Sequence, residues 1–73
     1  MDNTELKEAL TNRRPVVHMT VDGCPEYDVV YERVSAIIYR VIDGRLTVLA
    51  ELSDKHGHSV TIVKAEKVRY KED

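Results

Sequence analysis

The sequence has little of what several classes of protein require. It holds one cysteine, Cys24, no Phe and no Trp, and its three glycines are isolated from one another. A single cysteine allows neither a disulfide within the chain nor a cysteine-based zinc site. Isolated glycines form no Gly-rich phosphate-binding loop. No apolar run approaches the roughly 18 residues of a membrane-spanning helix, so we expect no membrane partner.

What is present is a globular mixture of residue types. Hydrophobic residues make up 42% of the 73 residues and charged residues 33%. This balance is typical of a folded chain rather than a disordered one. Residues 1–5 are acidic and polar and have none of the marks of a signal peptide. We therefore expect one small domain over residues 1–73, located in the cytoplasm, with residues 71–73 as a loose tail.

A β-hairpin dominates the middle of the chain. Asp43-Gly44 is a dipeptide suited to a two-residue type I′ turn, because both central residues of that turn need positive φ. The flanking residues 29–42 and 45–52 are rich in β-branched and aliphatic side chains. The turn fixes the register. The expected cross-strand pairs are Ile42 and Arg45, Val41 and Leu46, Tyr39 and Val48, Ile37 and Ala50, and Ser35 and Leu52.

A short helix is expected over about residues 4–13. Asp2 and Glu5 stand at capping-box spacing, and Leu6, Ala9 and Leu10 fall at i, i+3 and i+4 on one face. Pro15 disfavours the helical conformation at the residue before it. Asn12 is expected to take the left-handed conformation at the helix end. So short a helix is marginal in water, so its apolar face has to pack on the sheet.

The remaining segments predict further strands within a β-rich part over about residues 15–70. Residues 16–21 form a first strand and residues 54–58 a loop. Residues 59–63 return as a strand, with Ser53 opposite Ser59, Leu52 opposite Val60 and Ala50 opposite Ile62. Residues 65–67 form one helical turn and residues 68–70 a last strand. The expected fold is α+β: an N-terminal helix followed by a small curled antiparallel β-sheet, an SH3-like barrel.

One face of this sheet mixes apolar and charged residues. An apolar pair, Ile38 and Leu49, is surrounded there by polar side chains. The helix, curling of the sheet or a second copy of the chain could cover this face, and the sequence leaves the choice open. If the helix does not cover it, the face is a protein-binding patch. The candidate interaction surface comprises Ile38, Arg40, Thr47, Leu49 and Glu51.

The sequence offers no recognisable catalytic apparatus. His56 and His58 flank Gly57 in a loop near Asp54, and we interpret them as polar loop residues, although whether they ever bind metal stays open. Cys24 lies between acidic neighbours, which disfavour a thiolate. We expect no enzyme activity, no cofactor and no metal. The leading hypothesis is a non-enzymatic interaction module that binds a protein partner, or itself, through a sheet face or an edge strand.

Nucleic-acid binding is the alternative hypothesis. It would use Arg33, Arg40, Arg45 and the tyrosines, with base stacking on the aromatic rings. The net charge is −2. Proteins that bind nucleic acid through phosphates usually carry a clear basic excess, so this alternative ranks second.

The sequence also carries a resemblance. The run from Tyr31 to Arg40, followed by Ala50-Glu51-Leu52, Asp54-Lys55 and Ser59-Val60-Thr61, resembles small uncharacterised proteins carried on conjugative mobile elements of Gram-positive bacteria. The resemblance spans residues 6–68. It implies a cytoplasmic accessory protein of a mobile element and assigns no catalytic residues.

Overall fold

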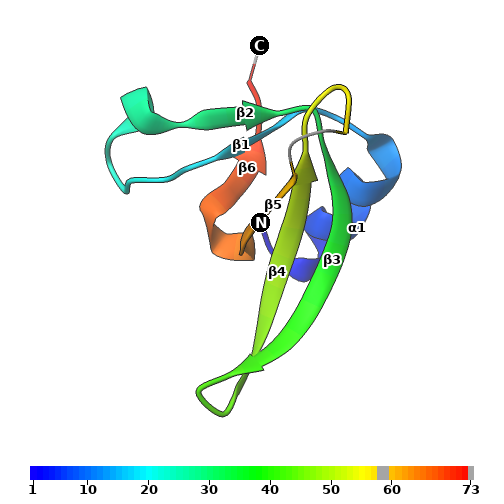
Figure 1. Ribbon diagram of the computed structural model, residues 1–73, viewed down its shortest axis with the longest axis vertical. Helices are drawn as coiled ribbons and strands as arrows, with labels where there is room; N and C mark the ends of the chain where they lie inside the picture. Colours follow the sequence, from blue (N-terminus) through cyan, green and yellow to red (C-terminus); the bar gives the residue numbers. More distant parts are fainter. Residues whose placement is uncertain (58–59, 73) are drawn as a thin grey trace.

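The computed structural model describes residues 1–57 and 60–72. It has one N-terminal α-helix and two antiparallel three-stranded sheets, ordered β2-β1-β6 and β3-β4-β5, so the expected α+β class is confirmed (Figure 1). The two sheets are separate in the hydrogen-bonding pattern. The elements are α1 (Asn3–Asn12), β1 (Val16–His18), the 3₁₀ helix η1 (Pro25–Tyr27), β2 (Val29–Tyr31), β3 (Arg33–Ile42), β4 (Arg45–Ser53), β5 (Val60–Lys64), the 3₁₀ helix η2 (Ala65–Lys67) and β6 (Val68–Tyr70).

The capping box that starts α1 is confirmed. The Asp2 carboxylate accepts from the Glu5 N–H at 2.8 Å, and the Glu5 carboxylate accepts from the Asp2 N–H at 3.3 Å. The end of the helix differs from expectation, because Arg13, with φ 58°, takes the left-handed conformation in place of Asn12. The Asn12 Oδ1 instead accepts from the N–H of Arg14 at 2.9 Å. This side-chain contact to the backbone serves the turn that follows the helix.

The expected apolar face of the helix is buried at two of its three residues. Leu6 and Ala9 are fully buried, whereas Leu10 is 38% exposed. The contact stripe is therefore centred between Leu6 and Ala9, and Leu10 lies at its border.

The β3–β4 hairpin has the expected turn and most of the expected register. Asp43 and Gly44 have φ 51° and 75°, as a type I′ turn requires. The pairs from Ile42–Arg45 to Ile37–Ala50 are confirmed. The last expected pair, Ser35–Leu52, is wrong, because a β-bulge places Ser35 as an extra residue. Val34 therefore lies opposite Leu52 and joins the core.

The expected long strand over residues 29–42 is two strands that belong to different sheets. The break is at Glu32, whose N–H donates to the Ser53 carbonyl at 3.0 Å. Before it, β2 pairs with β1, and after it, β3 pairs with β4. The first strand is also shorter than expected and ends at His18. The chain thus passes from one sheet to the other at this corner.

The register of β5 is shifted by one residue from the expected one. Val63 lies opposite Ala50, and Thr61 lies opposite Leu52. Because side chains alternate between the two faces of a strand, the shift moves Val63 into the core. It also leaves Ile62 44% exposed. The expected Ser59 pairing is replaced by Ser53 opposite Val60; His58 and Ser59 themselves lie outside the described residues.

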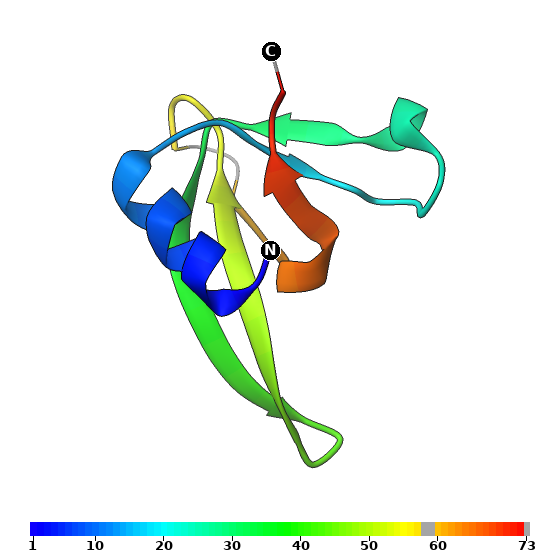
Figure 2. The same cartoon turned by 180° about the vertical axis from the view of Figure 1, so that it is seen from behind.

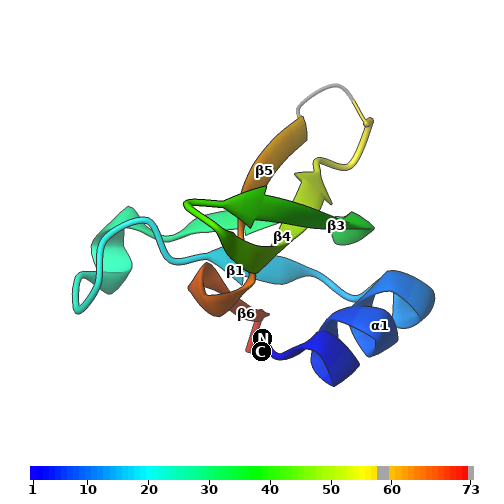
Figure 3. The same cartoon turned by 90° about the horizontal axis from the view of Figure 1, so that it is seen from below.

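The main core lies on one side of the β3–β4 hairpin, the side that α1, β1 and β6 occupy (Figures 2 and 3). We call this side of the β3-β4-β5 sheet the inner face and the opposite side the outer face. The helix therefore covers the inner face and leaves the mixed, outer face free of α1, which answers the question that the sequence left open. The buried core cluster comprises Leu6, Ala9, Val16, Val34, Ala50, Leu52, Val63, Ala65 and Val68.

No helix in the described part of the chain combines the length and the hydrophobicity needed to cross a lipid bilayer.

Candidate interaction surface

The five residues of the surface predicted from the sequence share the outer face. Ile38 lies opposite Leu49, and Arg40 lies opposite Thr47. Glu51 lies opposite Ala36, one step further along the same face. Strand alternation keeps all of them on the side away from α1.

The outer face is nevertheless less open than expected. Leu49 is only 6% exposed, and Ile38 is half-buried, so their apolar pair does not protrude. Arg40 is exposed, whereas Thr47 and Glu51 are half-buried. This face presents charged and polar groups around a largely covered apolar strip.

The register of β5 adds a cation to the outer face. Lys64 lies opposite Leu49, at the position where the expected register had put Val63. Together with Arg40 and Arg45, it gives this face three positive charges. Arg33 does not join them, because it lies opposite Ser53 at the far end of the hairpin.

The tyrosines do not gather beside these cations. Tyr31 and Tyr70 pack against the core. The Arg14 guanidinium lies over the Tyr70 ring, 4.3 Å from the ring centroid. The Tyr70 hydroxyl accepts from the Asn12 side-chain amide at 3.0 Å. The Tyr39 hydroxyl donates to Asn3 Oδ1 at 2.6 Å. These rings make contacts within the chain.

A second surface, which the sequence reasoning did not select, lies on the far half of the hairpin. We call residues 39–48 the distal hairpin; it extends beyond α1 and the rest of the fold (Figures 1 and 2). Val41 and Leu46 lie opposite each other on its inner face and are 72% and 71% exposed. Tyr39, next to them on the same face, is 49% exposed. Three neighbouring apolar side chains therefore face solvent.

The lengths of the elements explain this exposure. A helix of ten residues such as α1 extends about 15 Å, whereas a strand of ten residues such as β3 extends about 33 Å. The helix can therefore cover only about half of the hairpin. The sequence contained this signal, because the expected helix was already much shorter than the expected strands.

The distal hairpin also has an unpaired main-chain edge. β5 pairs with β4 from Leu49 to Ser53, so within residues 1–57 and 60–72 the segment 45–48 of β4 has a neighbouring strand, β3, on one side only. We call residues 45–48 the open edge. In a hairpin with a two-residue turn, the residues that flank the turn, here Ile42 and Arg45, form a hydrogen-bonded pair. Hydrogen-bonded and non-hydrogen-bonded pairs then alternate along the two strands, so the next pair, which contains Leu46, is not hydrogen-bonded. The N–H and C=O of Leu46 are therefore directed away from β3, toward the open side.

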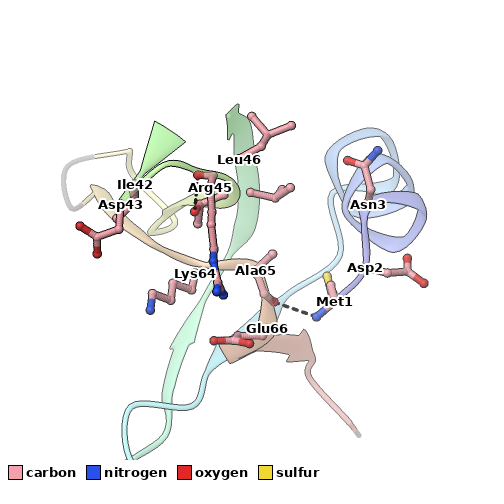
Figure 4. A pocket seen from close by; sticks show the side chains of 12 residues that line it. Met1, Asp2, Asn3, Ile42, Asp43, Arg45, Leu46, Lys64, Ala65 and Glu66 are labelled. Carbon is pink, nitrogen blue, oxygen red and sulfur yellow. Dashed lines mark hydrogen bonds between the residues drawn. The ribbon is translucent and has the colours of Figure 1, made fainter. Parts of the chain in front are cut away.

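A pocket of about 680 Å³ lies along this open edge (Figure 4). Its walls come from three segments: the chain start at residues 1–3, the hairpin turn with the open edge, and residues 64–66. The Met1 nitrogen fixes the first wall to the third, because it donates to the Ala65 and Val68 carbonyls at 2.8 and 2.9 Å. Charges of both signs surround the pocket: Asp2, Asp43 and Glu66 are negative, and Arg45 and Lys64 are positive.

Two carboxylates of the acidic segment over residues 22–32 form ion pairs within the chain. The Asp28 carboxylate pairs with the Arg69 guanidinium at 3.0 Å, and Asp22 pairs with Lys67. Both contacts tie the long β1–β2 connection to the η2–β6 segment.

The loop after β4 gives no metal centre in the part that is described. The His56 N–H donates to the Asp54 carboxylate at 3.1 Å, a local turn contact. No group of three or more His, Cys, Asp or Glu side chains suited to a metal ion occurs among residues 1–57 and 60–72. Cys24 is a half-buried free thiol beside η1.

Comparison with known proteins adds no relative: no protein-family model, no curated protein and no solved structure matches this chain.

Proposed function

We propose that this protein is a non-enzymatic interaction module that binds a polypeptide strand along the open edge of β4. The observation that carries the proposal is the juxtaposition at Leu46. Its side chain is 71% exposed beside that of Val41, and its main-chain groups are directed toward a side with no strand. Strand addition uses both features, since main-chain hydrogen bonds supply affinity and alternate side chains supply specificity.

The geometry of the pocket supports the same reading. A bound strand would lie between the open edge and the wall formed by residues 64–66. Native proteins usually cover or interrupt an exposed edge, because unpaired main-chain groups recruit other strands. Here the edge is next to exposed apolar side chains, which is the composition of a contact surface rather than of a protected edge.

The proposal also includes an SH3-like arrangement of the strands and a cellular setting for the module. The chain has a long β1–β2 connection, a three-stranded meander, the 3₁₀ turn η2 and a last strand that returns to β1. This connectivity supports an SH3-like arrangement, a scaffold on which many peptide-binding sites are built. We place the module in the cytoplasm, as an accessory protein of a mobile element, on the strength of the sequence resemblance.

Selection from a displayed library of random peptides tests the proposal. Enriched peptides would be added to the labelled protein, and the amide chemical shifts would locate their site. We expect the largest shifts at Leu46, Val48 and the wall at Ala65. A pair of variants separates main-chain from side-chain contributions. Leu46→Pro removes the outward N–H, whereas Leu46→Thr keeps it and removes the apolar side chain.

Leu46→Pro is expected to abolish peptide binding, and Leu46→Thr to weaken it. Proline is tolerated at this position of an edge strand because the lost N–H does not pair with β3. Shifts that gather away from the open edge would refute the proposal, and so would a failure to enrich any peptide in a protein that also does not self-associate.

A second candidate function is nucleic-acid binding at the outer face, favoured by the three cations Arg40, Arg45 and Lys64. Titration with single-stranded and duplex oligonucleotides distinguishes it. Binding that shifts these three residues and falls steeply with added salt would support it. Binding that is indifferent to salt would discard it.

A further inference from the structure

We infer that the strand that binds the open edge is the same edge of a second copy of this chain, so that the protein forms a symmetric dimer; this inference rests on the proposed function. In an antiparallel arrangement with a two-fold axis beside Leu46, the two Leu46 residues lie opposite each other. Each donates its N–H to the other's carbonyl. The open edge is complementary to itself in this register.

The side chains match in the same register. Both Leu46 side chains project on the inner face, next to Val41 and Val48 of each copy. The two exposed apolar pairs would thus form one continuous row across the axis. Cross-strand apolar neighbours of this kind stabilise a sheet.

The charges around the edge also suit a contact between two identical copies. A symmetric contact brings one patch against itself, so a patch of a single sign would repel its own copy. Here the pocket carries both signs: Asp2, Asp43 and Glu66 are negative, and Arg45 and Lys64 are positive. In the register about Leu46, the turn of one copy reaches residues 48 and 49 of the other copy. Within each copy, Lys64 lies opposite Leu49. Asp43 of each copy then lies near Lys64 of the other.

The contact is short, because the open edge spans only residues 45–48. Interfaces that bury less than about 1,200 Å², the lower limit of the standard size, are typical of weak or transient complexes. We therefore expect a dimer that dissociates on dilution.

A disulfide trap tests the register. Opposed residues in a hydrogen-bonded pair lie about 5.5 Å apart between Cα atoms, within the range that a disulfide spans. In a Cys24→Ser background, Leu46→Cys is expected to give a covalent dimer under mild oxidation. Val60→Cys, a substitution at an exposed β5 position away from the axis, is the matched control and is expected to give no covalent dimer. Equal crosslinking of both variants would overturn the register.

Charge exchange tests the contact without a covalent bond. Asp43→Lys and Lys64→Asp each place like charges together and are expected to be monomeric by sedimentation equilibrium. An equal mixture of the two is expected to dimerise, because both contacts then join opposite charges. Asp43 lies in the left-handed region, so lysine there strains the turn, and the mixture rather than the single variant is the decisive sample.

The outcomes separate this inference from the proposed function. A wild-type protein that is monomeric at all concentrations but binds selected peptides at Leu46 would overturn the dimer and keep the module. A dimer that persists in Leu46→Pro, with no covalent trapping at Leu46, would overturn the inferred contact, and selected peptides that shift residues away from the open edge would overturn the module as well.

Discussion

The two halves of the β3–β4 hairpin have the same alternation of side chains but opposite surroundings. In the half near α1, the inner-face residues Ala50 and Leu52 are completely buried. In the distal hairpin, Val41 and Leu46 occupy equivalent inner-face positions and are mostly exposed. Alternation thus determines which residues share a face, whereas the neighbouring element determines whether that face is buried. The distal half is available for contact because α1 ends its coverage half-way along the strands.

The largest effect is expected at the helix residue that covers the inner face. Leu6→Ala should lower the free energy of unfolding by about 2–5 kcal/mol, because it removes a fully buried side chain and leaves a cavity. Urea unfolding of dilute protein measures it. Leu10→Ala, on the same helix, should cost clearly less because Leu10 lies at the rim. Equal losses in the two alanine variants would contradict the assigned helix face. If Leu6→Ala does not fold, Leu6→Met can be measured instead, and it is expected to cost under about 1.5 kcal/mol.

The start of the helix should contribute next. Asp2→Ala is expected to lower the free energy of unfolding by about 1 kcal/mol, since it removes the side-chain acceptor of the Glu5 N–H. Asp2→Asn keeps a capping oxygen and should retain most of the stability. Thermal unfolding of the two variants side by side gives the answer. A loss of similar size in both would mean that the cap is not what Asp2 supplies.

A smaller effect should come from the contact that links the helix to the distal hairpin. Tyr39→Phe removes the hydroxyl that donates to Asn3, and we expect a loss of about 0.5 kcal/mol, at the low end for a hydrogen bond because both residues are exposed. Tyr27→Phe, in the exposed η1 segment, is the matched control and should leave stability unchanged. A loss above about 1.5 kcal/mol would show that the helix holds the distal hairpin more firmly than the geometry indicates.

The smallest effect should be at the exposed apolar pair. Leu46→Thr is expected to change the free energy of unfolding by less than about 0.5 kcal/mol, because the side chain lies in solvent and threonine suits a strand. Urea unfolding at a concentration that favours the monomer measures it. A loss of more than about 2 kcal/mol would mean that the distal hairpin is packed within the chain, and the comparison between the two halves would fail.

Local signals predicted much of this fold. Asp43-Gly44 specified the turn and, through it, the register over most of the β3–β4 hairpin. The Asp2–Glu5 spacing specified the helix start, and the η2 turn and β6 lie where the sequence placed them. Each of these features depends on residues that are close together in the chain.

The features that the sequence did not predict depend on tertiary packing. A five-residue loop does not fix a register, so the pairing of β5 was wrong by one residue. Nothing in the local sequence marks the bulge at Ser35 or the corner at Glu32, which arise where the chain passes from one sheet to the other. The candidate site was predicted as a face, and its five members do share that face. To predict the exposed pair Val41 and Leu46 on the other face, the length of the helix had to be compared with that of the strands.

Amide hydrogen exchange at Leu46 and Ala50 distinguishes an open edge of β4 from a covered one. Both N–H groups are directed toward the β5 side of β4, but only Ala50 has a β5 partner there. In dilute protein, we expect rapid exchange at the Leu46 amide and slow exchange at the Ala50 amide. Equal protection of the two amides in the monomer would show that the edge of β4 is already covered, and would contradict the account.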